Sequence, residues 1–184
     1  MKFHSFTQTT LRAAYLADIS LSGSGKEKEA FEQLLPRVKI LYAILKGRTE
    51  GEDLAGGIKK LQTSNNWKEF LRELYKIEKK YEASLANEQK WYFKVGVAAA
   101  TVREGIENKN YFTFILVDED FAGFVKSAPN GTPLPLLASL KQTSEIFKNT
   151  KFGINSPNSD YAVLKTQIKL IYNSVGQFNI KDKN

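Results

Sequence analysis

Residues 64–85, with the sequence SNNWKEFLRELYKIEKKYEASL, decide the fold class of this chain. Ser64, Asn65 and Asn66 are good helix caps, because their side chains can accept hydrogen bonds from the first free backbone N–H groups. Apolar side chains then recur every three or four residues, which places them on one face of a helix. They are Trp67, Phe70, Leu71, Leu74, Ile77, Tyr81 and Leu85. The stretch therefore predicts an amphipathic helix packed on a core.

The helical pattern extends beyond residue 85 toward the C-terminus. Apolar residues continue at helical spacing as far as Ile106, and a break near Ala86-Asn87 would divide the stretch into two helices. Residues 95–100, VGVAAA, have small side chains on every side. This composition predicts a central helix that its neighbours approach closely.

Further helical patterns lie on both sides of this stretch. They cover residues 6–19, 26–46, 52–62, 136–147 and 157–176. Pro36 is expected to kink or restart the helix of residues 26–46, because proline cannot donate a hydrogen bond to the preceding turn. Residues 20–25, SLSGSG, predict a flexible break, and the proline-rich residues 126–135 predict a loop.

Residues 111–117, YFTFILV, are the one convincing strand candidate. The run is rich in aromatic and β-branched residues and has polar residues on both sides, which favours a strand. A strand needs a partner, and residues 2–6, 151–155 and 177–180 are the candidates. The alternative is a helix that continues to Val125, and periodicity does not separate the two.

Composition bounds the fold class and excludes several kinds of site. The chain has 184 residues, of which 42% are hydrophobic and none is cysteine, so disulfides and thiolate sites are excluded. No apolar run approaches the ~18 residues of a membrane-spanning helix, and residues 7–12 interrupt any secretory signal core. We therefore expect a cytoplasmic, mainly α protein. It would be a single domain over residues 1–184, a bundle of about six helices with at most a small β element near 111–117.

The charge balance favours an anionic partner, and nucleic acid is the first to consider. The chain carries 27 Lys and Arg against 20 Asp and Glu, a net charge of +7. On the helix predicted from residue 67, five cations fall within a sector of about 120°, opposite the apolar stripe. These are Lys68, Arg72, Lys76, Lys79 and Lys80. They could meet successive phosphates. The alternative is an ordinary solvated face, since Glu69 and Glu73 border the sector and would form local ion pairs.

A second basic cluster is expected on the last helix, where Lys165 and Lys169 lie one turn apart. Lys148 and Lys151 shortly precede that helix, and a groove would result if both clusters joined in space. Aromatic residues offer another contact surface. Residues 91–93, Trp-Tyr-Phe, cannot all face the core from one side of a helix, so one ring is expected on the surface, where it could stack on a base, or against a partner. The more common explanation of such a cluster is burial by another helix or subunit.

Three other patterns could indicate a catalytic or binding site, but each also has an ordinary structural interpretation. Residues 22–26, SGSGK, lack the first glycine and the hydroxyl residue of a phosphate-binding loop, so they predict a linker. His4 has no neighbour in sequence that would orient it as a general base. Asp118 and Asp120 follow an apolar run, where two carboxylates could hold Mg²⁺ for phosphoryl transfer. The alternative is a turn in which Asp120 caps the next helix.

Together these features predict a protein that is not an enzyme and needs no cofactor or metal. The leading hypothesis is an accessory subunit, bound to other protein subunits, that lines the backbone of RNA or single-stranded DNA without base-specific readout. In size, helicity and charge the chain resembles the small helical subunits of RNA-guided CRISPR effector complexes. This resemblance is one of architecture, and no sequence motif supports it. One alternative is a protein-interaction module, with incidental basicity, that binds through exposed rings such as one of residues 91–93. Another is a metal-dependent phosphoryl-transfer enzyme using Asp118 and Asp120.

Overall fold

The structure, a computed structural model, describes residues 27–107, 111–115, 117–153 and 155–176. All regular secondary structure within these residues is helical, and six of the described helices have 16 or more residues. The prediction of a mainly α bundle is therefore confirmed. The helix expected at residues 6–19 and the break expected at 20–25 lie outside the described residues. The chain divides into two compact units, whose described parts are residues 27–85 and 86–176.

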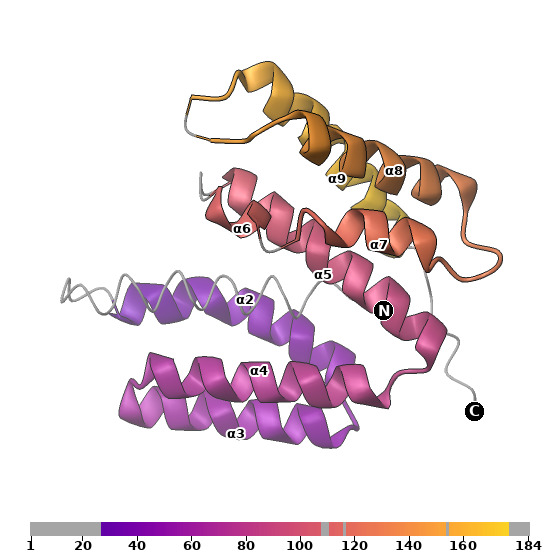
Figure 1. The fold of residues 1–184 in the computed structure, drawn as a ribbon. Coiled ribbons are helices and arrows are strands. Elements are labelled where there is room, and N and C mark those ends of the chain that lie inside the picture. The colour runs from indigo at the N-terminus through magenta and orange to yellow at the C-terminus, as the bar shows by residue number, and fades with distance from the viewer. Residues whose placement is uncertain (1–26, 108–110, 116, 154, 177–184) are drawn as a thin grey trace. The chain divides into compact units, whose positions relative to one another are not determined.

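The first unit consists of α2 (Glu27–Leu45), α3 (Thr49–Ser64) and α4 (Trp67–Ser84). α3 packs against both α2 and α4, and α3 and α4 lie side by side in Figure 1. The helix α2 continues through Pro36 without a restart, and its end is followed by Gly47 with a φ of 81°. α3 begins earlier and ends later than the predicted residues 52–62, because its two central glycines do not interrupt it.

The junction between α3 and α4 forms as the sequence predicts. Asn65 adopts the left-handed conformation, with a φ of 50°, and its backbone N–H donates to the carbonyl oxygen of Leu61. Asn66 then caps α4, since its side-chain oxygen accepts from the backbone N–H of Glu69 at 3.1 Å. The cap fixes where α4 begins and so fixes the phase of its apolar stripe. Phe70, Leu74 and other stripe residues are buried.

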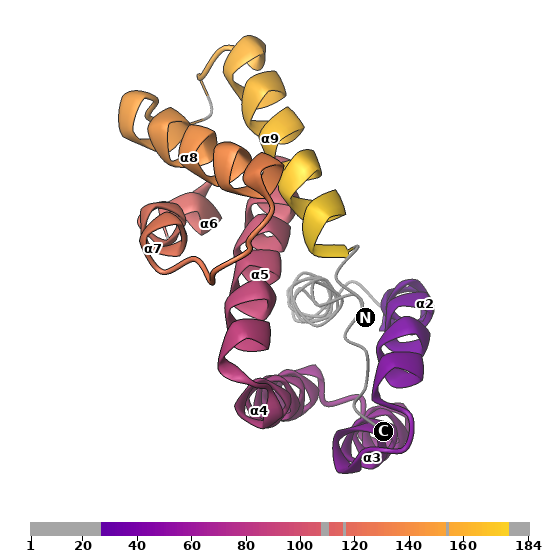
Figure 2. The same ribbon diagram turned by 90° about the vertical axis from the view of Figure 1, so that its right-hand side faces the viewer.

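The second unit is built around α5 (Asn87–Glu107), which packs against α6 (Phe112–Ile115), α7 (Asp120–Lys126) and α9 (Asn158–Gly176). The helix α8 (Leu134–Asn149) packs against α7 and α9, as Figure 2 shows. The predicted break at Ala86-Asn87 separates α4 from α5. The loop expected at 126–135 is observed as residues 127–133, and Pro135 belongs to the first turn of α8, where proline is well tolerated.

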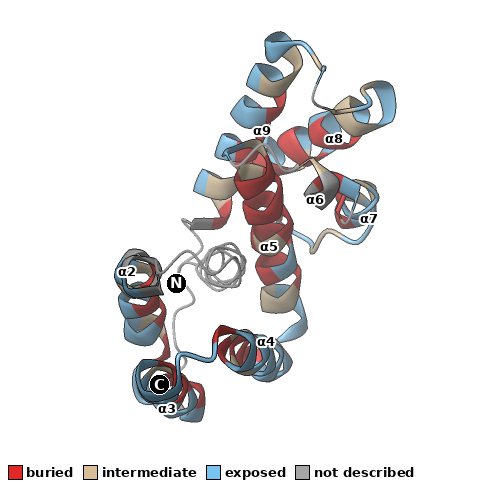
Figure 3. Cartoon of the chain, turned by 90° about the vertical axis from the view of Figure 1, so that its left-hand side faces the viewer, coloured by how far each residue is buried: buried red, intermediate tan, exposed pale blue. Residues whose placement is uncertain are grey.

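The helix α5 is buried along most of its length, which Figure 3 shows by its colour. The small residues of 95–100 are buried as predicted, with the exception of the half-buried Val97. The expectation of an exposed ring in residues 91–93 was wrong, because Trp91, Tyr92 and Phe93 are all buried, and burial by other helices is the interpretation that holds. Their neighbours explain this result: α5 has helices packed on several sides, and the Trp91 indole N–H donates to the carbonyl oxygen of Phe124 on α7 at 3.2 Å.

The prediction of a β element near 111–117 was also wrong. Residues 112–115 form α6, a single helical turn flanked by turns at residues 111 and 117. The ring of Phe114 is buried among other rings, with edge contacts to Phe147 at 5.8 Å and Phe152 at 5.4 Å between centroids. Tyr111 stacks on Tyr161 of α9. These contacts with α8 and α9 stabilise the segment without a partner strand, which a strand would have needed.

Candidate nucleic-acid interface

The five cations predicted on α4 all lie exposed on one side of the helix, and we call this set the α4 ridge. Its members are Lys68, Arg72, Lys76, Lys79 and Lys80. The opposite side of α4 is buried through Phe70, Leu74, Ile77 and Tyr81. Core packing therefore fixes which way the ridge faces. From its first to its last residue the ridge extends about 18 Å along the helix axis, at 1.5 Å per residue.

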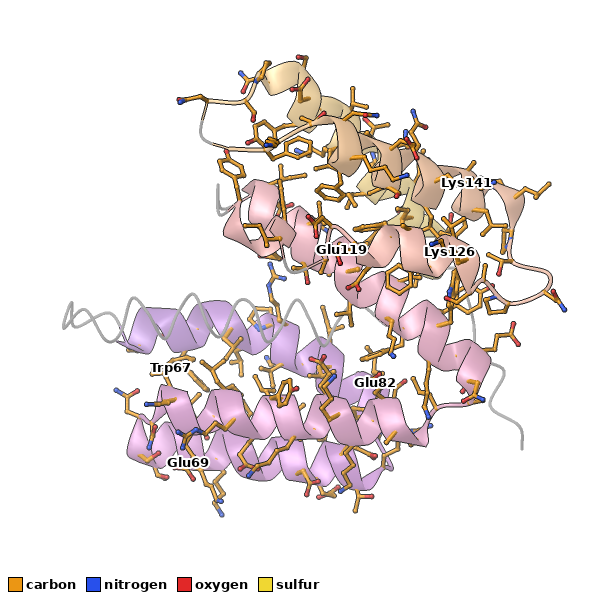
Figure 4. All side chains as sticks on the ribbon, in the orientation of Figure 1. Trp67, Glu69, Glu82, Glu119, Lys126 and Lys141 are labelled. Atoms are coloured by element: carbon orange, nitrogen blue, oxygen red, sulfur yellow. The ribbon has the colours of Figure 1, made fainter. Side chains whose placement is uncertain are left out.

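Three members of the ridge have acidic partners. Lys76 pairs with Glu73 at 2.8 Å, Lys79 with Glu82 at 3.1 Å, and Lys80 with Asp53 of α3 at 2.8 Å. The lysine side chains in these pairs are about half exposed or more, so the pairs contribute little stability and a phosphate can compete for the lysine. Figure 4 labels Glu82, near the end of α4.

The remaining two members, Lys68 and Arg72, form no ion pair with any residue that the structure describes. Glu69 borders them, as predicted, but its carboxylate accepts a hydrogen bond from the Asn66 side chain at 3.3 Å. The N-terminal half of the ridge is therefore its uncompensated part. Hydrogen bonds to Glu82 and Asp53 raise the pKa values of Lys79 and Lys80, respectively, so both lysines are positively charged at neutral pH.

Sequence reasoning missed Tyr75, an aromatic residue beside the ridge. Its side chain is 57% exposed, and the Nζ atom of Lys79 lies 5.5 Å from its ring centroid. The available signal was its position outside the apolar stripe of α4. An exposed ring next to cations is the combination on which single-stranded nucleic acids stack their bases.

The second predicted cluster lies in the other unit. Lys165 and Lys169 of α9 line a groove with Arg103 of α5, a residue that the sequence analysis did not select. Lys148 and Lys151 are exposed but do not line this groove, and Lys148 pairs with Glu145 at 2.8 Å. The α4 ridge and the α9 cluster belong to different compact units, so each is a separate candidate site.

The carboxylates after residue 117, on which the enzymatic alternative depends, have different surroundings. The Asp118 carboxylate accepts a hydrogen bond from the backbone N–H of Glu119 at 2.8 Å. Asp120 is the first residue of α7 and not its cap, which corrects that expectation. It lines a groove with Glu119, Lys90 and Lys94, and Asp118 is absent from the lining. Within the described residues, no group of three or more Asp, Glu or His side chains is arranged to hold a metal ion.

Comparisons with protein-family models, with curated proteins and with solved structures find no match for this chain. Among the described helices, none combines the length and the apolar character that crossing a bilayer requires. His4 and the glycine-containing residues 22–26 lie outside the described residues.

Proposed function

We propose that this protein is a non-enzymatic accessory subunit that binds the backbone of single-stranded nucleic acid along the α4 ridge, as part of a larger complex. The observation that carries the proposal is the set of five exposed cations on one face of α4, held outward by the buried opposite face. A rigid row of cations neutralises successive phosphates and reads no base sequence.

Tyr75 supports a single strand over a duplex as the ligand. Its exposed ring can stack on a base only where that base is free of its own stacking partners. In a duplex the bases are stacked inside, and only the phosphates would meet the ridge. We therefore expect tighter binding to RNA or single-stranded DNA than to double-stranded DNA, and little dependence on sequence.

The other two hypotheses have less support. The protein-interaction module was expected to use exposed rings such as one of residues 91–93, and these three rings are buried. The phosphoryl-transfer enzyme was expected to use Asp118 together with Asp120, and only Asp120 lines the nearby groove.

The test is a titration of the purified chain with labelled single-stranded RNA, single-stranded DNA and double-stranded DNA at two salt concentrations. If all five ridge cations meet phosphates, the slope of log K against log salt is about −3.5 for a single strand. Affinity should then fall about a hundredfold between about 50 and 200 mM salt. Absence of binding at low salt would contradict the proposal.

Variants locate the binding surface. Lys68→Glu, Arg72→Glu and Lys76→Glu together should abolish most of the binding and most of its salt dependence. The matched control reverses Lys126, Lys141 and Lys151, three exposed lysines of the other unit, so the net charge changes equally. If both triple variants bind equally weakly, overall charge and not the ridge is responsible.

Single neutral variants test the role of the ion pairs. Arg72→Gln should weaken binding more than Lys76→Gln, because Lys76 is already paired with Glu73 and Arg72 has no acidic partner among the described residues. Tyr75→Leu should reduce affinity for single strands and leave binding to double-stranded DNA unchanged. Circular dichroism should confirm equal helix content in every variant.

A further inference from the structure

A groove between α5 and α9 combines cations with an apolar surface, all within the unit of residues 86–176. Its volume is about 370 Å³, which lies in the range of small-ligand sites. The lining residues are Arg103, Ile106, Glu107, Lys165, Ile168, Lys169, Tyr172 and Asn173. Two helices far apart in the sequence therefore contribute to one hollow surface.

The charges of the groove do not cancel. Lys165 and Lys169 are exposed and form no ion pair with any described residue. Arg103 donates from Nε to Glu107 at 2.8 Å, which neutralises one of the three cations. The groove thus keeps two uncompensated positive charges, one helical turn apart on α9. Such a pair suits a dianionic phosphate better than a single carboxylate.

The apolar part of the lining selects against a bare anion. Ile106, Ile168 and Tyr172 line the same groove as the cations, and the Arg103 guanidinium lies 5.3 Å from the centroid of the Tyr172 ring. A guanidinium held over an aromatic ring offers a flat surface on which a heterocycle can stack. The ligand that fits this lining has a phosphate at one end and a flat ring at the other.

We propose that this groove binds one nucleotide, with its phosphate between Lys165 and Lys169 and its base against the Arg103–Tyr172 pair. The nucleotide comes either from solution as a nucleoside monophosphate or from a bound strand, because both present the same chemical group. The proposal does not depend on the α4 ridge, which belongs to the other unit.

Calorimetric titration with AMP, adenosine, inorganic phosphate and a short oligoadenylate tests the groove. AMP should bind at least about tenfold more tightly than adenosine or phosphate, since only AMP presents both groups. Lys165→Glu with Lys169→Glu should abolish AMP binding, whereas the control pair Lys141→Glu with Lys148→Glu, also exposed and in the same unit, should leave it unchanged. Tighter binding of the oligoadenylate than of AMP identifies the strand as the source, and the reverse identifies the free nucleotide.

A gain-of-affinity variant keeps the test independent of folding defects. Glu107→Gln removes the carboxylate that neutralises Arg103, so AMP should bind about threefold more tightly. A chain with the ridge reversed at Lys68, Arg72 and Lys76 should still bind AMP, so failure of the ridge and failure of the groove are separable. Undetectable binding of both AMP and the oligoadenylate would overturn the proposal, as would binding that is insensitive to reversal of Lys165 and Lys169.

Discussion

Two glycines of α3 are expected to respond to alanine in opposite directions. Gly51→Ala should destabilise residues 27–85, and Gly56→Ala should stabilise them. A Cβ atom added at residue 51 would lie 2.5 Å from the carbonyl oxygen of Leu45 and 3.2 Å from its carbonyl carbon. These are backbone atoms at the end of α2, so they cannot rotate away as a side chain could. At residue 56, no atom lies within 4 Å of the added Cβ.

The magnitudes follow from two opposing effects. Alanine is favoured over glycine inside a helix by roughly 1 kcal/mol, which is the whole gain expected at residue 56. At residue 51 the added methyl group overpacks a closed contact, which typically costs about 1–3 kcal/mol. The free energy of unfolding should therefore rise by up to about 1 kcal/mol for Gly56→Ala and fall by up to about 2 kcal/mol for Gly51→Ala.

Urea unfolding, followed by circular dichroism and by tryptophan fluorescence, measures both changes. Trp67 lies in the unit that contains the two glycines, so its fluorescence reports on the affected helices. The comparison is well matched, because both substitutions add the same methyl group to the same helix. Equal stability of the two variants would refute the inference that α2 and α3 approach each other closely at Leu45.

Three further predictions concern stability. Phe114→Ala should cost about 3–5 kcal/mol in urea unfolding, because it empties a buried position among aromatic rings; its neighbour Ile115, 70% exposed, should tolerate alanine within about 0.5 kcal/mol. Asn66→Ala should lower the free energy of unfolding by about 1 kcal/mol, because it removes the side-chain hydrogen bond that caps the first turn of α4. Asn66→Asp keeps an acceptor at this position and should restore the stability. Burial raises the pKa of the Tyr92 hydroxyl above its ordinary value of 10.0, against an opposing hydrogen bond with Thr132. The unfolded chain then loses this proton first, so the stability is full below pH 10 and falls as the pH rises through the folded-state pKa. Tyr92→Phe should show a shallower decline in an alkaline unfolding series, and an unchanged decline would contradict the assigned burial.

The sequence was sufficient where local chemistry decides the structure. The Asn65-Asn66 junction, the break at Ala86-Asn87 and the outward direction of the α4 ridge all follow from caps and helical spacing, which act over one or two turns. The sequence was insufficient where contacts between residues far apart in the chain decide the local structure. Residues 111–117 have the composition of a strand, but rings from α8 and α9 hold them as a helical turn.

The same distinction applies to the candidate sites. The ridge lies on a single helix, so its five members could be selected by counting residues. The groove could not be found in this way, because Arg103 and Lys165 are 62 residues apart in the printed sequence and meet only through the packing of α5 on α9. Lys165 and Lys169 were selected as neighbours on α9, and the groove forms only because Arg103, Ile106 and Glu107 of α5 line its other side.

The distribution of aromatic rings leaves few of them available to the proposed binding surfaces. The aromatic residues 91–93 were considered as a contact surface, but they are buried, and most rings from Tyr111 to Tyr161 pack on one another. Among the described residues, the aromatic side chains with large exposure are Tyr42 and Tyr75, and Tyr75 has a ridge cation over its ring. An aromatic ring can contribute to recognition only where packing leaves it at least partly exposed next to a charged side chain. For this chain, that condition places the ring of Tyr75 with the α4 ridge and the half-buried ring of Tyr172 with the groove.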